Sequence, residues 1–244
     1  MDPFLLVHIL VGVVALVTFW LALGARKGRG SHRVVGRVFF AAMLLVVVTV
    51  APLLVTDRPL DPGRVVQLVY LSACVASVVA LGWTSVRWRR APERFASLPL
   101  RGVGAVLTGL GGVVLLAGLL TANPVAAVLS WVGLAFGSAM VRSHGKRGAS
   151  NGWLQWHLDA VCGLLTAVHG TLAYVAWRGL VAPGAGPWTA AGFHVGVLVI
   201  AIVARAWLAR RYRAPSLVFV APTPTWRPTG ARRGSRPGAP SRPG

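Results

Sequence analysis

Histidine side chains inside apolar stretches are the first candidates for chemistry in this sequence. His8, His169 and His194 each lie in an apolar run of about 20 residues. Neutral imidazole is a good ligand for haem iron, zinc and copper, and it titrates near neutral pH. These residues therefore predict a haem or transition-metal site, a proton path, or hydrogen bonds between helices.

The three histidines have matching positions along their apolar runs. Each lies 15 or 16 residues from the basic end of its run. An α-helix rises about 1.5 Å per residue, so all three are expected about 22 to 24 Å from that membrane boundary. We therefore predict that His8, His169 and His194 form an outer cofactor-binding site.

A second, inner site is expected near the other boundary. His157 lies twelve residues before His169, which corresponds to about 18 Å along a helix. Two stacked b-type haems need two ligands at each level, so we expect His157 to act with His32 or His144. The latter two are expected in loops.

The stretch 153–177 contains His157, His169 and most other polar candidates in apolar surroundings. Its polar residues recur at steps of four and three: Gln155, Asp159, Cys162, Thr166 and His169. This spacing places them on one stripe of a helix. A polar stripe must face protein or water because lipid cannot satisfy it, so we expect this helix inside a bundle.

Two charged residues are expected to meet in the membrane. Asp159 precedes His169 by ten residues, and Arg205 follows His194 by eleven. If these antiparallel helices are neighbours, the two charges lie at one depth, and an isolated charge there would be costly. We predict an Asp159–Arg205 intramembrane ion pair, with extension of Arg205 to the surface as the alternative.

The composition specifies the class of protein that positions these groups. Hydrophobic residues make up 55% of the 244 residues and charged residues only 12%, so we expect an all-α integral membrane bundle. Seven apolar spans are long enough to cross a bilayer. They are residues 4–23, 38–55, 65–86, 102–122, 125–141, 153–177 and 188–209.

The basic residues predict the orientation of the bundle. The chain has 25 Lys and Arg against 5 Asp and Glu, and 21 of the 25 fall in alternate loops and the final segment. The positive-inside rule therefore places the N-terminus outside and the C-terminus in the cytoplasm, and we expect a bacterial plasma (inner) membrane.

The last segment, residues 214–244, is rich in Pro, Gly and Arg. We expect a disordered, basic cytoplasmic tail that is attracted to anionic lipid headgroups. No nucleic-acid-reading module accompanies this charge, so membrane lipids are the expected partners. A membrane protein partner is a further possibility.

The sequence resembles a group of bacterial multi-pass membrane proteins known only as a domain of unknown function. The resemblance rests first on His8, Gly12 and the basic segment that includes His32-Arg33 and Gly36-Arg37. It continues with His157, Thr166 and the Arg210–Arg213 cluster. It covers the first two and the last two spans, and Asp159 and Cys162 depart from the pattern. The resemblance implies packed membrane helices rather than a particular reaction.

The leading functional hypothesis is therefore a b-haem or metal-binding redox component of the membrane. The alternatives are a small proton-coupled transporter that uses the Asp159–Arg205 layer and a non-catalytic membrane partner subunit. Whether the chain is an enzyme stays open, because no hydrolytic residue set or phosphate-binding glycine loop is present.

Overall fold

The computed structural model describes residues 3–56, 62–96, 98–142 and 152–219, and α-helices are the only regular elements in these ranges. In chain order the helices are α1 (Pro3–Gly24), α2 (Gly30–Thr56), α3 (Pro62–Arg87), α4 (Pro92–Ala96), α5 (Leu100–Leu120), α6 (Pro124–Leu129), α7 (Trp131–Arg142), α8 (Gly152–Leu180) and α9 (Pro187–Tyr212).

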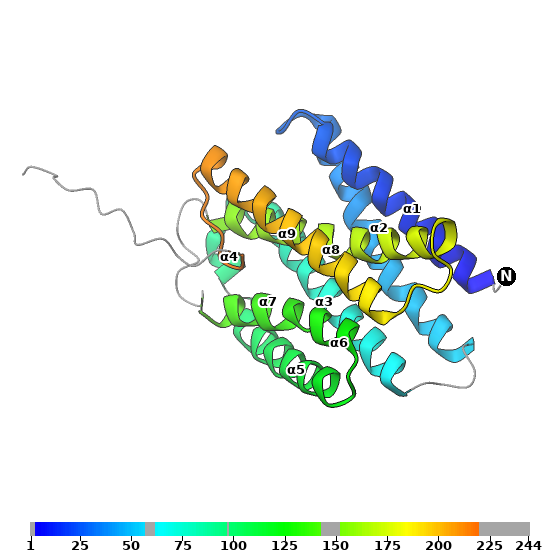
Figure 1. Cartoon of the computed structure of the whole chain (residues 1–244). Coiled ribbons are helices and arrows are strands. Elements are labelled where there is room, and N and C mark those ends of the chain that lie inside the picture. Colours follow the sequence, from blue (N-terminus) through cyan, green and yellow to red (C-terminus); the bar gives the residue numbers. More distant parts are fainter. Residues whose placement is uncertain (1–2, 57–61, 97, 143–151, 220–244) are drawn as a thin grey trace, which may run out of the picture.

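The described ranges contain seven segments that are long and apolar enough to cross a membrane. Six of them are the single helices α1, α2, α3, α5, α8 and α9, and the seventh is formed by α6 and α7 together (Figure 1). The short helix α4 lies in the basic connection between α3 and α5. The prediction of an all-α, multi-pass membrane bundle is thus confirmed.

The second helix begins earlier than the apolar pattern predicts. We expected the span to begin at residue 38, but α2 begins at Gly30 and includes His32, Arg33 and Arg37. The apolar pattern misses these two turns because charged side chains at the end of a membrane helix extend towards water. His32, which we expected in a loop, therefore lies on a helix.

The fifth span is divided into α6 and α7 at Ser130. The N–H of Gly133 donates to the Tyr70 hydroxyl at 2.9 Å, and this hydroxyl donates to the Ser130 carbonyl oxygen, also at 2.9 Å. A side chain inserted into the ladder of backbone hydrogen bonds kinks a helix. Tyr70 of α3 thus explains a break that the hydropathy of this span could not indicate.

Glycines bring α5 close to the α6–α7 segment. A Cβ atom added at Gly104, Gly111 or Gly118 of α5 would lie only 2.6–2.8 Å from a backbone atom of that segment. Small residues allow this close approach, which gains packing contacts between membrane helices. These three helices form a scaffold on one side of the bundle (Figure 1).

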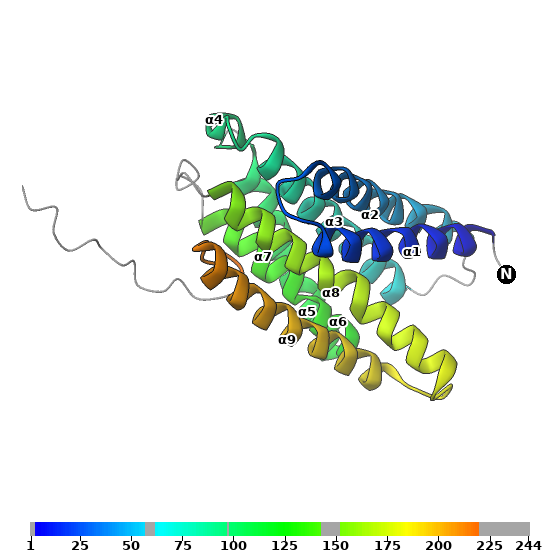
Figure 2. The same cartoon turned by 90° about the horizontal axis from the view of Figure 1, so that it is seen from above.

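Helix α8 lies between α1 and α9 (Figure 2). It packs against α3 and α9 and, over a smaller area, against α1. Helix α1 pairs mainly with α2, and this hairpin is tilted across α8 (Figure 1). The polar stripe predicted on α8 faces protein, since Asp159, Cys162 and Thr166 are all buried.

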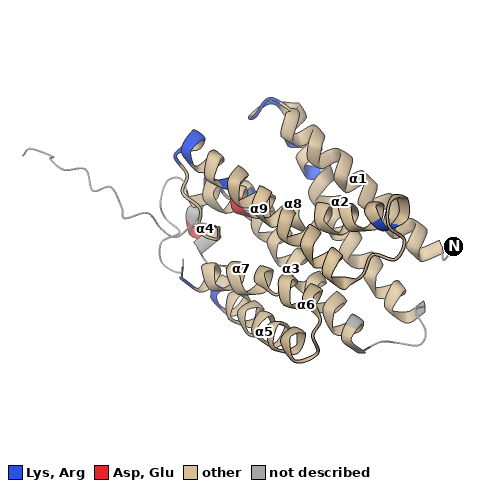
Figure 3. Cartoon of the chain, viewed as in Figure 1, with Lys and Arg blue, Asp and Glu red and all other residues tan. Residues whose placement is uncertain are grey.

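Most of the described Lys and Arg residues lie at one end of the bundle (Figure 3). This end, which we call the basic end, contains the end of α1, the start of α2, the end of α3, the start of α8 and the end of α9. The separation of charge agrees with the predicted alternation of loops, and the assignment of this end to the cytoplasm stays a prediction.

The chain turns back into the bundle after α9. Arg213 has a left-handed φ of 50°, and its N–H donates to the Ala209 carbonyl oxygen at the end of the helix. Residues 214–219, which we call the C-terminal strap, then follow. Ala214 and Ser216 are buried, and the Phe219 ring packs against two aromatic rings of α7.

The strap corrects the predicted boundary of the tail. Residues 214–219 are packed against the bundle, so the prediction of a disordered tail is wrong for these six residues. Averaging the composition over 214–244 concealed the apolar sequence Leu217-Val218-Phe219 at its beginning. Residues 220–244 lie outside the described residues.

Candidate functional site

A partly open cavity of about 880 Å³ lies at the basic end of the bundle. Its wall is built from α1, α2, α3, α8 and α9 and from the turns that follow α1 and α3. We call it the basic cavity. Its polar lining comprises Lys27, His32, Arg33, Arg37, Arg87, Arg89, Arg90, Trp153, His157 and Tyr212, and its apolar lining includes Phe19, Leu23, Phe39, Phe40, Trp83, Leu158, Val161 and Leu208.

The charges of this lining are of one sign. Among the described residues the cavity is lined by six Lys or Arg side chains and by no Asp or Glu. Like charges around a concave, partly apolar surface reinforce one another and concentrate anions there. The geometry therefore creates a positive site with no counter-charge among the described lining residues.

The local sequence explains how the cations converge. Arg33 and Arg37 are four residues apart at the start of α2, so they lie on the same face of that helix. Lys27 donates from Nζ to the carbonyl oxygens of Ala22 and Leu23 at 2.9 and 2.8 Å, which satisfies the end of α1. Partial burial lowers the pKa of Lys27 below its ordinary value.

Two of the predicted inner-site histidines line the same cavity. His32 donates from Nδ1 to the Ala22 carbonyl oxygen at 2.9 Å, which leaves the lone pair on its Nε2. His157 lies on α8, and its Nδ1 is buried without a hydrogen-bond partner among the described residues. The structure thus brings His32 and His157 to one cavity, while His144 lies outside the described residues.

Aromatic rings connect the cavity with the next histidine on α8. Phe40 contacts His157 with ring centroids 6.3 Å apart, and the neighbouring Phe39 contacts Phe19 at 5.5 Å. Phe19 in turn lies 5.3 Å from the ring of His169. These rings close the apolar end of the cavity.

The predicted outer site does not form at one level. The Trp20 indole N–H donates to His169 Nε2 at 3.0 Å, while His169 Nδ1 donates to the Leu165 carbonyl oxygen. His8 lies twelve residues before Trp20, about 18 Å away along α1, and its Nδ1 bonds Thr49. The common depth expected for His8 and His169 is therefore wrong, because the tilted α1–α2 hairpin does not run parallel to α8.

His194 occupies a third environment. It is buried and lies so close to Gly170 of α8 that a Cβ atom added to this glycine would collide with the imidazole ring. Within the described residues, no group of three or more His, Cys, Asp or Glu side chains is arranged to hold a metal ion. The structure thus does not gather His8, His169 and His194 into one metal-ligand cluster.

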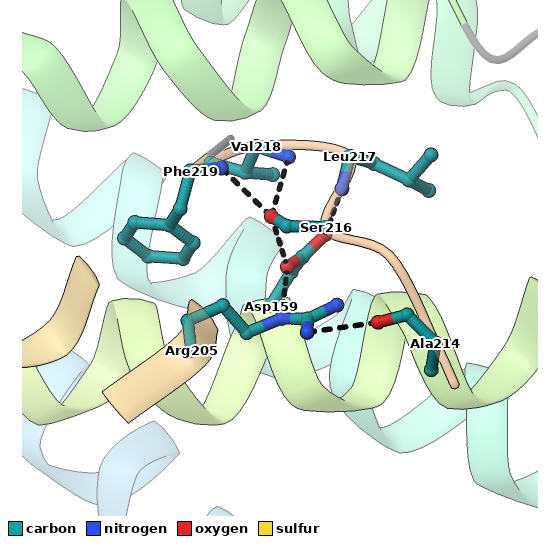
Figure 4. A network of polar contacts seen from close by, with 7 residues as sticks. All are labelled: Asp159, Arg205, Ala214, Ser216, Leu217, Val218 and Phe219. Atoms are coloured by element: carbon teal, nitrogen blue, oxygen red, sulfur yellow. Dashed lines mark hydrogen bonds and ion pairs between the residues drawn. The ribbon is translucent and has the colours of Figure 1, made fainter. Parts of the chain in front are cut away.

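The predicted Asp159–Arg205 ion pair is confirmed. Arg205 Nε lies 2.6 Å from Asp159 Oδ1, and both side chains are completely buried (Figure 4). The pair connects α8 with α9, the two helices on which it was predicted. Arg205 does not extend to the surface: its side chain is completely buried, and its Nη2 has no hydrogen-bond partner among the described residues.

The C-terminal strap completes this buried network. The Ser216 hydroxyl donates to Asp159 Oδ1 at 2.7 Å, and the Leu217 N–H donates to Asp159 Oδ2 at 2.8 Å. Arg205 Nη1 donates to the Ala214 carbonyl oxygen at 2.9 Å (Figure 4). Ser216 Oγ also accepts from the N–H groups of Val218 and Phe219. Such saturation is what a buried carboxylate requires.

Neither the strap nor the convergence of the basic connections on one cavity was predicted from the sequence. Ser216 and its neighbours gave no periodic signal, because an irregular segment has none. The spacing of Arg33 and Arg37 did indicate one helix face, but the cations of the α1–α2 and α3–α5 connections meet only in three dimensions.

The fold and the site together define a multi-pass helical membrane protein with a positively charged cavity at one end. No protein family, curated protein or solved structure matches this chain in the comparisons. The resemblance to bacterial membrane proteins of unknown function therefore stays a prediction.

Proposed function

We propose that this protein binds an anionic ligand with a phosphate group in the basic cavity, at the cytoplasmic face of a bacterial inner membrane. The observation that carries the proposal is the convergence of six cationic side chains, with no acidic partner among the described lining residues. Charges left unpaired in this way destabilise the protein when the site is empty, and an anion offsets that cost.

Phosphate is the anion class that this lining fits best. Arginine presents a planar fork of N–H donors that matches two phosphate oxygens, and five of the six cations are arginines. His32 and His157 also line the cavity beside these cations. The concentration of Lys and Arg at this end favours the cytoplasmic side.

The direct test compares two double variants of the full-length protein in detergent. Arg33→Ala/Arg37→Ala removes two cavity cations, and Arg210→Ala/Arg211→Ala removes two exposed cations of α9 that do not line the cavity. Calorimetry with inorganic phosphate, glycerol 3-phosphate and short-chain phosphatidic acid measures affinity. We expect a loss of about tenfold or more for at least one ligand in the first variant alone.

Failure of all three phosphate compounds to bind the wild-type protein would contradict the proposed function. Equal affinity of both double variants for a ligand that does bind would also contradict it, because the cavity would then not be the site. Both variants keep the helix interior unchanged, so folding can be verified by the melting temperature.

A second candidate is haem b binding in the same cavity. His32 and His157 line it from α2 and α8, and arginines are suitable partners for haem propionates. His32 Nε2 and His157 Nδ1 have no hydrogen-bond partner among the described residues. Haem supplied during expression should then give a reduced b-type absorption band that His157→Ala abolishes and His8→Ala retains. A colourless sample without iron would contradict this candidate.

A further inference from the structure

On one side, packing between α1 and α9 does not close the basic cavity, and we call this side the opening. Both helices contribute to the cavity wall, α1 through Leu23 and α9 through Leu208 and Tyr212. However, α1 packs on α2 and α9 packs on α8, and α1 and α9 are not among the closely packed helix pairs. Figure 2 shows α8 between them, and α8 contributes His157, Leu158 and Val161 to the cavity wall.

The residues beside the opening are apolar and exposed. On α1, Leu23 is 46% exposed and lines the cavity, and on α9 Trp207, next to the lining residue Leu208, is 62% exposed. In a membrane-spanning bundle such residues face lipid chains. A molecule that reaches the cavity along this side therefore passes along a lipid-facing surface.

The cavity itself is amphipathic along its depth. Its cations come from helix ends and connecting turns at the basic end, such as Lys27, Arg33 and Arg90. Its apolar wall includes Phe19, Phe40 and Val161, which lie further into their helices. A soluble phosphate would use only the charged part, whereas a lipid would use both.

From these observations we infer that the ligand of the basic cavity is an anionic phospholipid that enters sideways from the bilayer. Its phosphate lies among the cations of α2 and the α3–α5 connection, and its acyl chains extend between α1 and α9. This inference rests on the proposed function, and it adds the substrate class and the route of entry. It commits to a lipid rather than to a free phosphate compound.

The opening provides a matched pair of variants. Leu23→Trp adds bulk at a residue that lines the cavity, whereas Leu21→Trp adds the same bulk nearby on α1 at a residue that does not line it. Both residues are exposed to lipid, so neither substitution removes a core contact. We expect Leu23→Trp alone to reduce lipid binding, by about fivefold or more.

The experiment reconstitutes the full-length protein in phosphatidylcholine vesicles that contain a small fraction of phosphatidic acid with a photoreactive acyl chain. The expected result is labelling of α1 and α9 beside Leu23 and Leu208 that a photoreactive phosphatidylcholine does not reproduce. Labelling by phosphatidic acid should decrease in two variants, Arg33→Ala/Arg37→Ala and Leu23→Trp. It should not decrease in the two controls, Leu21→Trp and Arg210→Ala/Arg211→Ala.

Two results would overturn this inference and leave the proposed function intact. In the first, glycerol 3-phosphate binds the cavity in calorimetry and abolishes the labelling at equal occupancy, which identifies an aqueous ligand. In the second, phosphatidic acid and phosphatidylcholine label the protein equally while soluble phosphate binding still depends on Arg33 and Arg37. If the wild-type protein binds neither phosphatidic acid nor the soluble phosphate compounds, both proposals are overturned.

Discussion

Two polar regions on α8 differ in whether their charges are paired. His157 of α8 lines the basic cavity, where cations have no acidic partner among the described residues. Asp159 is only two residues further along, but two residues rotate a helix by about 200°, so it faces the other side. There the charges are paired and covered by the C-terminal strap.

The contrast indicates which region maintains the fold and which is available to a ligand. The ion pair is completely buried under the strap, so another molecule cannot reach it, and breaking it leaves a buried charge. The cavity has an excess of one charge, and removing part of it relieves repulsion. Substitutions in the ion pair should therefore lower stability, whereas substitutions in the cavity should lower ligand affinity and leave stability nearly unchanged.

The largest effect is expected from Asp159→Ala. It leaves the Arg205 guanidinium buried without its carboxylate, and loss of one partner of a buried pair costs about 3–5 kcal/mol. The melting temperature in detergent should fall steeply. A double variant, Asp159→Leu/Arg205→Met, should recover much of this loss, because it removes both charges. Full stability of the single variant would show that the pair is not structural.

Removal of the strap should have the next largest effect. A chain that ends at Arg213 lacks the donors that Ser216 and Leu217 provide to Asp159, at an expected cost of about 2–3 kcal/mol. A chain that ends at Phe219 retains these contacts and is the matched control. Equal melting temperatures for the two truncated chains would contradict the role assigned to the strap.

Ser216→Ala should have a smaller effect. The substitution removes the hydroxyl that donates to Asp159 and accepts from two backbone N–H groups, while the Leu217 N–H and Arg205 still hold the carboxylate. We expect a loss of about 1–2 kcal/mol in denaturant unfolding. Ser216→Thr keeps the hydroxyl and should lose less, which separates the hydrogen bonds from the packing.

The smallest effect on stability is expected in the basic cavity. Arg33→Ala/Arg37→Ala should change the unfolding free energy by less than about 0.5 kcal/mol, because both side chains are exposed and have like-charged neighbours. Phosphate affinity should nevertheless fall, and it should fall for the wild-type protein as salt concentration increases. A large loss of stability in this variant would remove the contrast between the two regions.

The sequence predicted much of the buried network and less of the cavity. The depths of Asp159 and Arg205 could be counted along two neighbouring antiparallel helices, and the cost of an isolated charge in lipid required a partner. The same counting failed for His8 and His169, because α1 is tilted across α8. Residue counts along two helices predict that two side chains lie at the same depth only when the relative tilt of the helices is known.

The sequence by itself determined the class of this protein, its seven spans and the separation of its charges, because hydrophobic length and loop composition respond directly to the bilayer. Only the tertiary structure decided that residues 214–219 seal the ion pair and that cations from separate connections share one cavity. Contacts between residues far apart in the chain depend on helix tilt and packing, which local composition does not encode.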